Sequence, residues 1–248
     1  MRTKTGLLAL VWIISLTYLS AADFWDKKPY TDWKQKECEK LLEKSPWSHP
    51  YSITGVNIPG MMDYKTGGST AGRSFGDGSV DTVPGDREVH LFLQIRFLTA
   101  RPLKAAIGQS RLLADPKNQG LRDQVEQYIN QEDGPEIVVE VTYYSEPKGH
   151  PSLRQVEGFL RTTTLEAIQH KVWLSDSSAD TQVPIFRYQG PQEGYNGALL
   201  FFPRYDENGA PYFPGSEGDM LFHMEAGFGM VDLVLKQKDM TFNDEFTL

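Results

Sequence analysis

The sequence predicts an α+β fold: an antiparallel β-sheet or sandwich with several short helices packed on it. Residues 88–98 alternate apolar and polar side chains, which is typical of a strand with one buried face. Two segments with helical spacing follow, and then a second alternating strand at 136–144. From residue 171 onward, short strand-like segments succeed one another with turn residues between them. Helices grouped apart from a run of strands are typical of the α+β class.

The first 22 residues have the pattern of a cleaved signal peptide. Arg2 and Lys4 precede the apolar run Leu7–Leu19, and the small residues Ser20–Ala22 follow it. We place the cut before Asp23, which leaves a mature chain of 226 residues. The alternative is an uncleaved membrane anchor, for which a run of about 20 apolar residues is typical. We therefore expect no membrane span in the mature chain.

The charge of the mature chain limits its partners. Removing the leader lowers Lys plus Arg from 25 to 23 against 33 Asp plus Glu, so the net charge changes from −8 to −10. A chain this acidic, with no basic run, argues against nucleic acid or an anionic membrane surface as a partner.

The single cysteine, Cys38, cannot form an internal disulfide, and no Asn-x-Ser/Thr sequon occurs. Both observations favour a bacterial envelope or secreted protein over a eukaryotic one. We interpret Cys38 as a small buried apolar residue in a monomer. A dimer linked through this thiol is the alternative.

Residues 23–48 are predicted to form a helical segment that docks on the main domain. Thr31 suits the N-cap, and Ser45-Pro46 ends the helix after Lys44. Trp33, Cys38, Leu41 and Leu42 share one face of this helix, which we expect to pack on the main sheet.

The N-terminal segment also carries a resemblance. Residues 25–33 read Trp-x-x-Lys-Pro-Tyr-x-x-Trp, and Ser45-Pro46-Trp47 follows a helix that contains Glu37. With Phe201–Arg204 and the closing segment 231–240, these motifs resemble a family of uncharacterised exported bacterial proteins. The resemblance implies a periplasmic or extracellular location and implies no activity.

Residues 49–87 are predicted to be a Gly/Ser-rich loop, and residues 67–79 contain most of its glycine and serine. Residues 67–74 match a phosphate-binding loop with Arg73 in the place of the lysine. That motif needs a strand before it and a helix after it, and the flanking residues fit neither. We interpret the stretch as a mobile connection that binds no nucleotide.

Residues 88–248 are predicted to form the β-rich α+β domain. Helices are expected at 102–113 and 121–129, and residues 152–160 fit either a helix or part of a strand. The expected later strands are 171–175, 183–189, 198–203, 220–226 and 230–236. The turn Asp206–Gly209 lies in an aromatic segment that reads as a hairpin, from Phe201 to Pro214.

No catalytic residue, metal ligand or cofactor site can be assigned from the sequence. The five histidines stand apart from any second ligand at a metal-binding interval, and no Gly-x-Ser-x-Gly elbow occurs. Two carboxylates that converge only in the folded chain would escape a sequence search.

We therefore expect a non-catalytic binding or interaction protein of the cell envelope or exterior, with a protein or saccharide as partner. The alternative is a secreted hydrolase whose site is assembled only in the fold. Aromatic side chains supply large contact areas, although for the tryptophans we favour helix docking over a binding platform. The residues named as a candidate binding surface are Trp25, Trp33, Trp47, Phe201, Arg204, Tyr205 and Tyr212.

Export gives the first testable prediction. Because the charged start, the apolar run and the small-residue site form one signal, the mature protein should begin at Asp23. Intact-mass measurement of protein recovered outside the cytoplasm checks this. A mass that still includes residues 1–22 would contradict the prediction.

Overall fold

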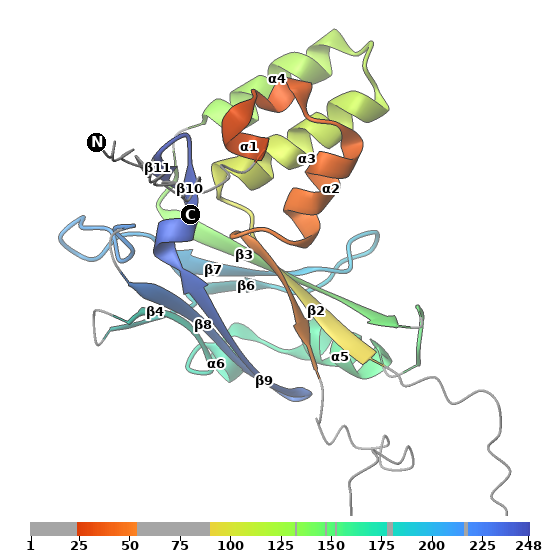
Figure 1. Ribbon diagram of the computed structural model, residues 1–248. Coiled ribbons are helices and arrows are strands. Elements are labelled where there is room, and N and C mark those ends of the chain that lie inside the picture. Colours follow the sequence, from red (N-terminus) through yellow and green to blue (C-terminus); the bar gives the residue numbers. More distant parts are fainter. Residues whose placement is uncertain are drawn as a thin grey trace, which may run out of the picture.

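The computed structural model describes residues 24–53, 90–131, 133–146, 148–151, 153–177, 181–215 and 218–248. The predicted signal peptide and the segment 54–89, with its Gly/Ser-rich stretch and Arg73, lie outside the described residues. The predicted α+β class is confirmed: antiparallel sheets form a sandwich, and helices pack around it (Figure 1).

The larger sheet has five strands in the order β1-β2-β3-β7-β6, and every neighbouring pair is antiparallel. Its middle strand is β3, and β2, which contains most of the alternating segment 88–98, lies beside it. Ile95 pairs with Val141 and Val139 pairs with Leu200, so apolar side chains form one continuous face across the sheet. The strands are β1 (Ser48–Ser52), β2 (His90–Phe97), β3 (Glu136–Glu146), β6 (Arg187–Gln189) and β7 (Ala198–Pro203).

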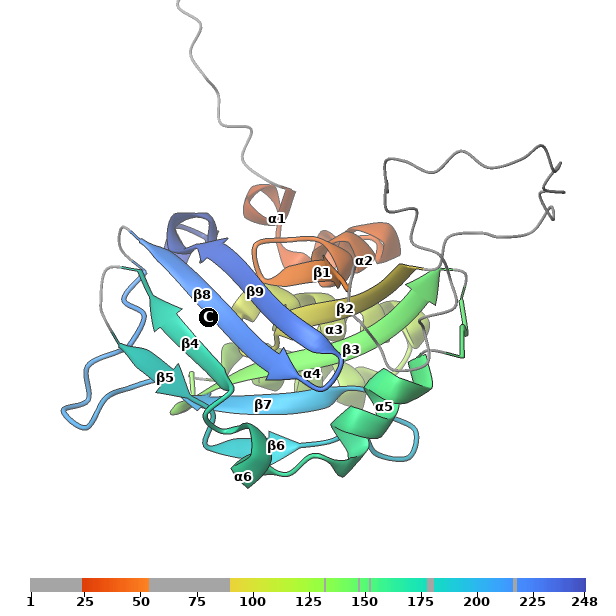
Figure 2. The ribbon, with the colours of Figure 1, turned by 90° about the horizontal axis from the view of Figure 1, so that it is seen from below.

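The second sheet covers this apolar face. Its order is β5-β4-β8-β9, again antiparallel, and Figure 2 shows it stacked against the larger sheet. The rings of Phe202 in β7 and Phe222 in β8 meet edge to face with centroids 6.5 Å apart. The strands are β4 (Val172–Asp176), β5 (Gln182–Pro184), β8 (Asp219–Ala226) and β9 (Gly229–Lys236).

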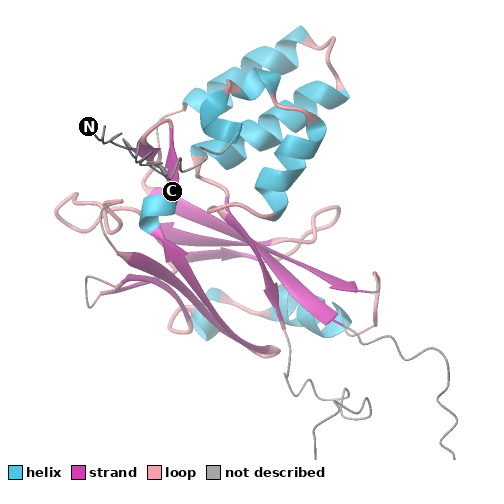
Figure 3. Cartoon of the chain, viewed as in Figure 1, coloured by secondary structure: helices cyan, strands magenta, loops and turns pink. Residues whose placement is uncertain are grey.

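Most helices lie on the opposite side of the larger sheet, as Figures 1 and 3 show. This group contains α1 (Phe24–Lys27), α2 (Gln35–Glu43), α3 (Arg101–Ala114) and α4 (Gln119–Asn130). Gly108 of α3 lies where a Cβ would collide with Val125 of α4, so the glycine permits close packing of these two helices. Helices α5 (Leu153–Thr162) and α6 (Leu165–Ile168) lie apart from this group, beside the sandwich.

The structure corrects several predicted boundaries in the first half of the chain. Helix α2 begins at Gln35, because a 3-10 turn at Tyr30–Asp32 precedes it, and Lys34 N–H then donates to the Glu37 carboxylate at 2.7 Å. This helix packs mainly on α3 and meets the sheet through β1 and through hydrogen bonds from Gln94 and Arg96 of β2 to its last turn, so its expected docking on the sheet is only partly right. Residues 48–52, which were placed at the edge of the predicted loop, form strand β1.

The second half contains two further differences. The predicted strand 183–189 is two short strands in different sheets, β5 and β6, because the chain crosses from one sheet to the other at residues 185–186. A terminal hairpin, β10 (Thr241–Phe242) and β11 (Glu245–Phe246), was not predicted. Its two turn residues, Asn243 and Asp244, have φ values of 52° and 63°, as a type I′ turn requires. The ambiguous segment 152–160 is helical, as α5.

The N-terminal tryptophans belong to the core. Trp25, Trp33 and Trp47 are 5%, 1% and 0% exposed, so they cannot form an exposed aromatic platform. Trp33 donates its indole N–H to the Lys28 carbonyl at 3.2 Å. Cys38 is also fully buried, which fits a packing role and leaves its thiol inaccessible to a second copy.

The burial of Trp33 gives the second prediction. Replacing a buried tryptophan by alanine removes its packing and leaves a cavity, so Trp33→Ala should lower the free energy of unfolding by about 3–5 kcal/mol. The control is Val234→Ala, since Val234 is 60% exposed and should change stability by less than about 0.5 kcal/mol. Chemical denaturation measures both, and an unchanged midpoint for Trp33→Ala would contradict the docking of this segment.

Candidate functional site

The candidate site is built around Arg204, which directly follows β7. Its backbone N–H donates to the Pro135 carbonyl at 2.8 Å, and its own carbonyl accepts from Tyr212 N–H at 3.0 Å. The first bond extends the β3–β7 ladder by one position, and the second belongs to the hairpin that follows. They bring the arginine to the end of the sheet where β3 begins.

A hairpin loop carries the chain away from Arg204 and back. Tyr205 and Pro211 form an isolated antiparallel bridge. At the turn, the Asp206 carboxylate accepts the backbone N–H groups of Asn208 and Ala210, both at 2.8 Å, and Gly209 has a φ of 82°. The turn predicted at Asp206–Gly209 is therefore confirmed, because Asp and Gly are the residues that this geometry favours.

The terminal hairpin supplies the opposite wall. Phe246 lies against Gly215, where an added Cβ would overlap the Phe246 ring, and Gly215 has a φ of 74°. Figure 1 places β10, β11 and the C-terminal end beside the helix group, at one end of the larger sheet. Segments distant in the sequence thus meet at one end of the sandwich.

These segments enclose a hollow of about 270 Å³. This is slightly smaller than the roughly 300–1,000 Å³ of ordinary small-molecule sites. Most of its lining residues are apolar, with one arginine and one aspartate among them, but polar atoms make up half of its surface. The lining residues are Asp133, Ile137, Arg204, Tyr205, Pro211, Phe213, Pro214, Phe246 and Leu248.

The Arg204 guanidinium is fixed by main-chain oxygens. Nε donates to the Gly134 carbonyl at 2.9 Å, and Nη2 donates to the main-chain oxygens of Glu136 and Leu248 at 3.3 and 2.6 Å. Nη1 has no hydrogen-bond partner among the described residues and is not sealed in the interior. Burial lowers the pKa of Arg204 from its ordinary value, and the charge of Asp133 opposes this shift.

Asp133 is the second charged group of the hollow. Lys104 of α3, itself buried, places its Nζ 3.5 Å from Asp133 Oδ1. That buried oxygen accepts no hydrogen bond from the described part of the chain, so the pair is held by charge alone. The Asp133 carboxylate therefore lies near two cationic side chains, Lys104 and Arg204.

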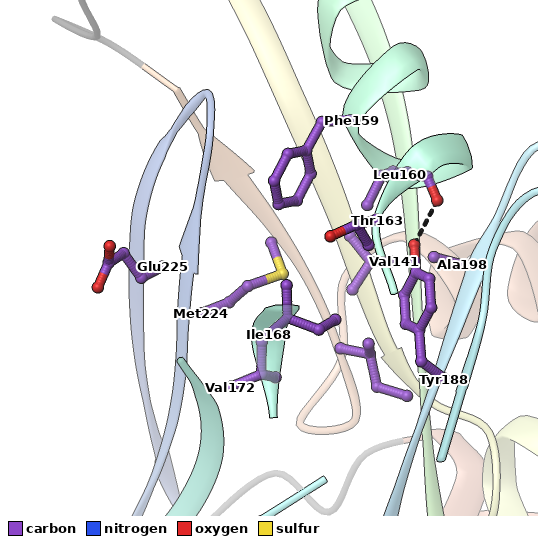
Figure 4. A pocket seen from close by; sticks show the side chains of 11 residues that line it. Val141, Phe159, Leu160, Thr163, Ile168, Val172, Tyr188, Ala198, Met224 and Glu225 are labelled. Atoms are coloured by element: carbon purple, nitrogen blue, oxygen red, sulfur yellow. Dashed lines mark hydrogen bonds between the residues drawn. The ribbon is translucent and has the colours of Figure 1, made fainter. Parts of the chain in front are cut away.

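A second, smaller cavity lies between the sheets and α5 (Figure 4). It has room for only about 10 Å³, which is at the lower limit for one water molecule. The lining is apolar, Tyr188 donates its hydroxyl to the Leu160 carbonyl, and the Glu225 carboxylate points away toward Lys171. We interpret this cavity as a packing void in the core.

Two polar clusters lie elsewhere on the sheets. On the larger sheet, the Glu140 carboxylate accepts from the Tyr195 hydroxyl and, at 2.8 Å, from Arg96 Nη1, while Arg96 Nε donates to the Leu42 carbonyl at 2.7 Å. Burial and the bond to Glu140 raise the pKa of Tyr195. Because these groups bind one another and the end of α2, the cluster ties the helix layer to the sheet.

The second cluster lies on the outer face of the smaller sheet. His223 stacks on Trp173 with ring centroids 4.6 Å apart, and its Nδ1 is 2.7 Å from Asp232 Oδ1. The three residues lie opposite one another on neighbouring strands, so this is a cross-strand ladder.

The structure separates the residues named as a candidate binding surface. The three tryptophans are in the core, and Phe201 is 7% exposed beneath the Arg187 guanidinium, at 3.6 Å from ring centroid to Cζ. Arg204 and Tyr205 line the hollow together, and the partly buried Tyr212 packs against the core beside it.

Sequence reasoning missed Asp133, Phe246 and Leu248. Asp133 precedes Gly134-Pro135, which marked only the end of a helix. The two turn residues Asn243-Asp244, between the apolar Phe242 and Phe246, were the available signal for the terminal hairpin. Pro211 and Pro214 belonged to the aromatic segment but were not singled out.

Within the described ranges, no group of three His, Cys, Asp or Glu side chains is arranged to hold a metal ion. None of the helices described has both the length and the apolar composition needed to cross a membrane.

Comparisons with other proteins give a structural likeness only. No family model matches the sequence, and no curated protein matches it. A crystal structure of a protein of unknown function from Burkholderia pseudomallei K96243 is similar, with 12% identity and a TM-score of 0.38 over 58% of this chain and 74% of the other. The resemblance to an exported bacterial family stays a prediction.

The contact between Gly215 and Phe246 gives the third prediction. Gly215→Ala should lower the free energy of unfolding by about 1–3 kcal/mol, because alanine is strained at this φ and would displace Phe246. The control is Gly158→Ala in α5, where nothing lies within 4 Å of the added methyl group. That change should stabilise the protein by about 0.5–1 kcal/mol. Urea titrations of both variants decide the matter, and equal effects would contradict the placement of Phe246.

Proposed function

We propose that this protein is a non-catalytic binding protein of the cell envelope or exterior that holds a small organic ligand in the Arg204 hollow. The location is supported by the signal-peptide pattern of residues 1–22. The binding role is supported by one observation above all, an unused guanidinium nitrogen at a hollow whose surface is half apolar and half polar. Small-molecule sites combine apolar surface with a few polar groups that orient the ligand, and this hollow offers both.

The hydrolase alternative has less support. A general acid at neutral pH needs a raised carboxyl pKa, whereas hydrogen bonds lower the pKa values of Glu37 and Asp206 on the surface. Burial lowers the pKa of His49, whose Nε2 lies 3.0 Å from the Pro46 carbonyl in a local packing contact. Binding is therefore the function that the geometry supports best.

A screen of small molecules tests this proposal and is the fourth prediction. Acidic, neutral and basic fragments at millimolar concentration are added to the isotope-labelled mature protein, and backbone amide shifts are recorded by NMR. Fragments that bind should shift residues 204–214 and 245–248, because these segments line the hollow.

A blocking variant and a matched control make the screen specific. Pro211→Trp adds a large ring at the hollow and should abolish the shifts. Pro184→Trp, the same change at an exposed proline of the smaller sheet, should preserve them. Absence of binding, or shifts that persist in Pro211→Trp, would contradict the proposal.

A further inference from the structure

We propose that strand β9 pairs with β9 of a second copy of this chain, so that the smaller sheets of two molecules join into one antiparallel sheet. This interface lies outside the Arg204 hollow and goes beyond the proposed ligand-binding function. It follows from the free edge of β9, from the side chains along that edge and from their order in the sequence.

Strand β9 is an edge of the smaller sheet (Figure 2) and pairs with β8 alone among the described strands. Directly after β9, the Gln237 N–H donates to the Gly218 carbonyl at 3.3 Å, toward β8. Main-chain groups alternate in direction along an antiparallel strand, so those of residues 232, 234 and 236 point away from β8. Within the described chain these groups have no hydrogen-bond partner. An unpaired row of this kind is a template for another strand.

The end of the edge near the β8–β9 turn is already engaged. The Met230 carbonyl accepts the Tyr51 hydroxyl at 3.4 Å, which agrees with the outward direction of the even-numbered residues and joins β9 to β1 at this end. The part of the edge that remains for a second strand is therefore 232–236.

Residues 232–236 combine exposed apolar and charged side chains. Val234 is 60% exposed, the highest value among the large apolar side chains of the described chain. Asp232 and Lys236 stand two residues away on either side and are exposed on the same face. The sequence Asp-Leu-Val-Leu-Lys therefore reads the same in both directions, except that an acid and a base exchange places.

This order makes the edge complementary to itself. In antiparallel pairing centred on Val234, the two valines lie opposite each other, and Asp232 of each copy lies opposite Lys236 of the other. Apolar pairs and opposite-charge pairs directly across two strands both stabilise a sheet. His223 Nδ1 lies 2.7 Å from Asp232 Oδ1, which leaves Oδ2 for the lysine. The occupant that this edge fits best is therefore a second copy.

Other registers fit less well. Pairing Asp232 with itself would place two carboxylates opposite each other and would use the Met230 end of the edge. Pairing Asp232 with Val234 would leave both charged side chains without an opposite charge. A lysine on an edge strand often discourages pairing, and the matched aspartate removes that protection here.

The dimer should be weak. Five paired residues form a short interface, and two acidic chains repel one another at long range. We expect a Kd of about 0.1–1 mM. The chain is then a monomer at the micromolar concentrations of denaturation experiments, so the Val234→Ala control used there is unaffected.

Sedimentation equilibrium of the mature protein, from micromolar to millimolar concentration at low ionic strength, tests the association. The expected result is a monomer–dimer equilibrium that weakens with added salt, because the charge pairs are exposed. A chain that stays monomeric throughout, or that grows into assemblies larger than a dimer, would overturn the proposal.

Two charge variants locate the interface. Asp232→Lys and Lys236→Asp each turn both opposite-charge pairs into like-charge pairs, so either variant alone should bind itself at least about tenfold more weakly. Mixed together, the two variants restore both opposite-charge pairs, and their heterodimer should have a Kd within about threefold of the unmodified dimer. Asp123→Lys makes the same charge change at an exposed position of α4 and should leave the Kd within about threefold.

The mixture also separates association from folding. Asp232→Lys removes the contact with His223, and Lys236→Asp faces Asp219 of β8, so either change costs some stability. Mixing two chains does not repair a folding defect in either one. Isotope-labelled Asp232→Lys is titrated with unlabelled Lys236→Asp, and NMR shifts are expected at the amides of residues 232–236. Equally strong dimers of each variant alone, or a mixture that fails to associate, would overturn pairing through β9.

Discussion

The hydrogen bond from the Trp47 indole N–H to the main-chain oxygen of Thr247 holds the layers of this protein together. It is 2.8 Å long, it is buried, and it joins residues 200 positions apart. Trp47 lies between α2 and β1, and the Trp25 ring packs on it edge to face. A buried oxygen that lost this donor would have no water to replace it, so the bond fixes where the end of the described chain must lie.

The position of the terminal segment in turn shapes the hollow. Thr247 also accepts the Arg101 backbone N–H at 3.0 Å through its hydroxyl, which ties the same segment to the start of α3. The flanking residues, Phe246 and Leu248, are then placed as walls, and the Leu248 main-chain oxygen receives Arg204 Nη2. The same packing arrangement therefore positions Phe246, Leu248 and the Arg204 guanidinium before any ligand binds. Such preorganisation lowers the entropic cost of binding.

Local patterns predicted the parts of this structure that depend on local physics. Strand β7 and the turn at Asp206–Gly209 agree with the sequence analysis, because an apolar run bounded by Gly and Asp turn residues leaves few alternatives. The crossing between β5 and β6 and the partnership of Arg204 with Gly134 depend on which strands pair across the fold. The amino-acid sequence carries no periodic signal that shows which distant strands pair. The candidate site was therefore recognised only in part.

Arg204 combines a structural task with the proposed binding task, and the two are physically coupled. Its Nε and Nη2 join the turn before β3, the first residue of β3 and the end of the described chain. The planar guanidinium of arginine holds its N–H donors in fixed directions toward these three acceptors, whereas the ammonium group of lysine could not reach all of them. The fold itself therefore favours arginine here. A ligand that accepts a hydrogen bond from Nη1 would engage the nitrogen that the described chain leaves unused, and would thereby strengthen the hold on the terminal segment. By linkage, a ligand that binds only this arrangement stabilises the folded chain, by an amount that rises with the logarithm of its concentration divided by its Kd.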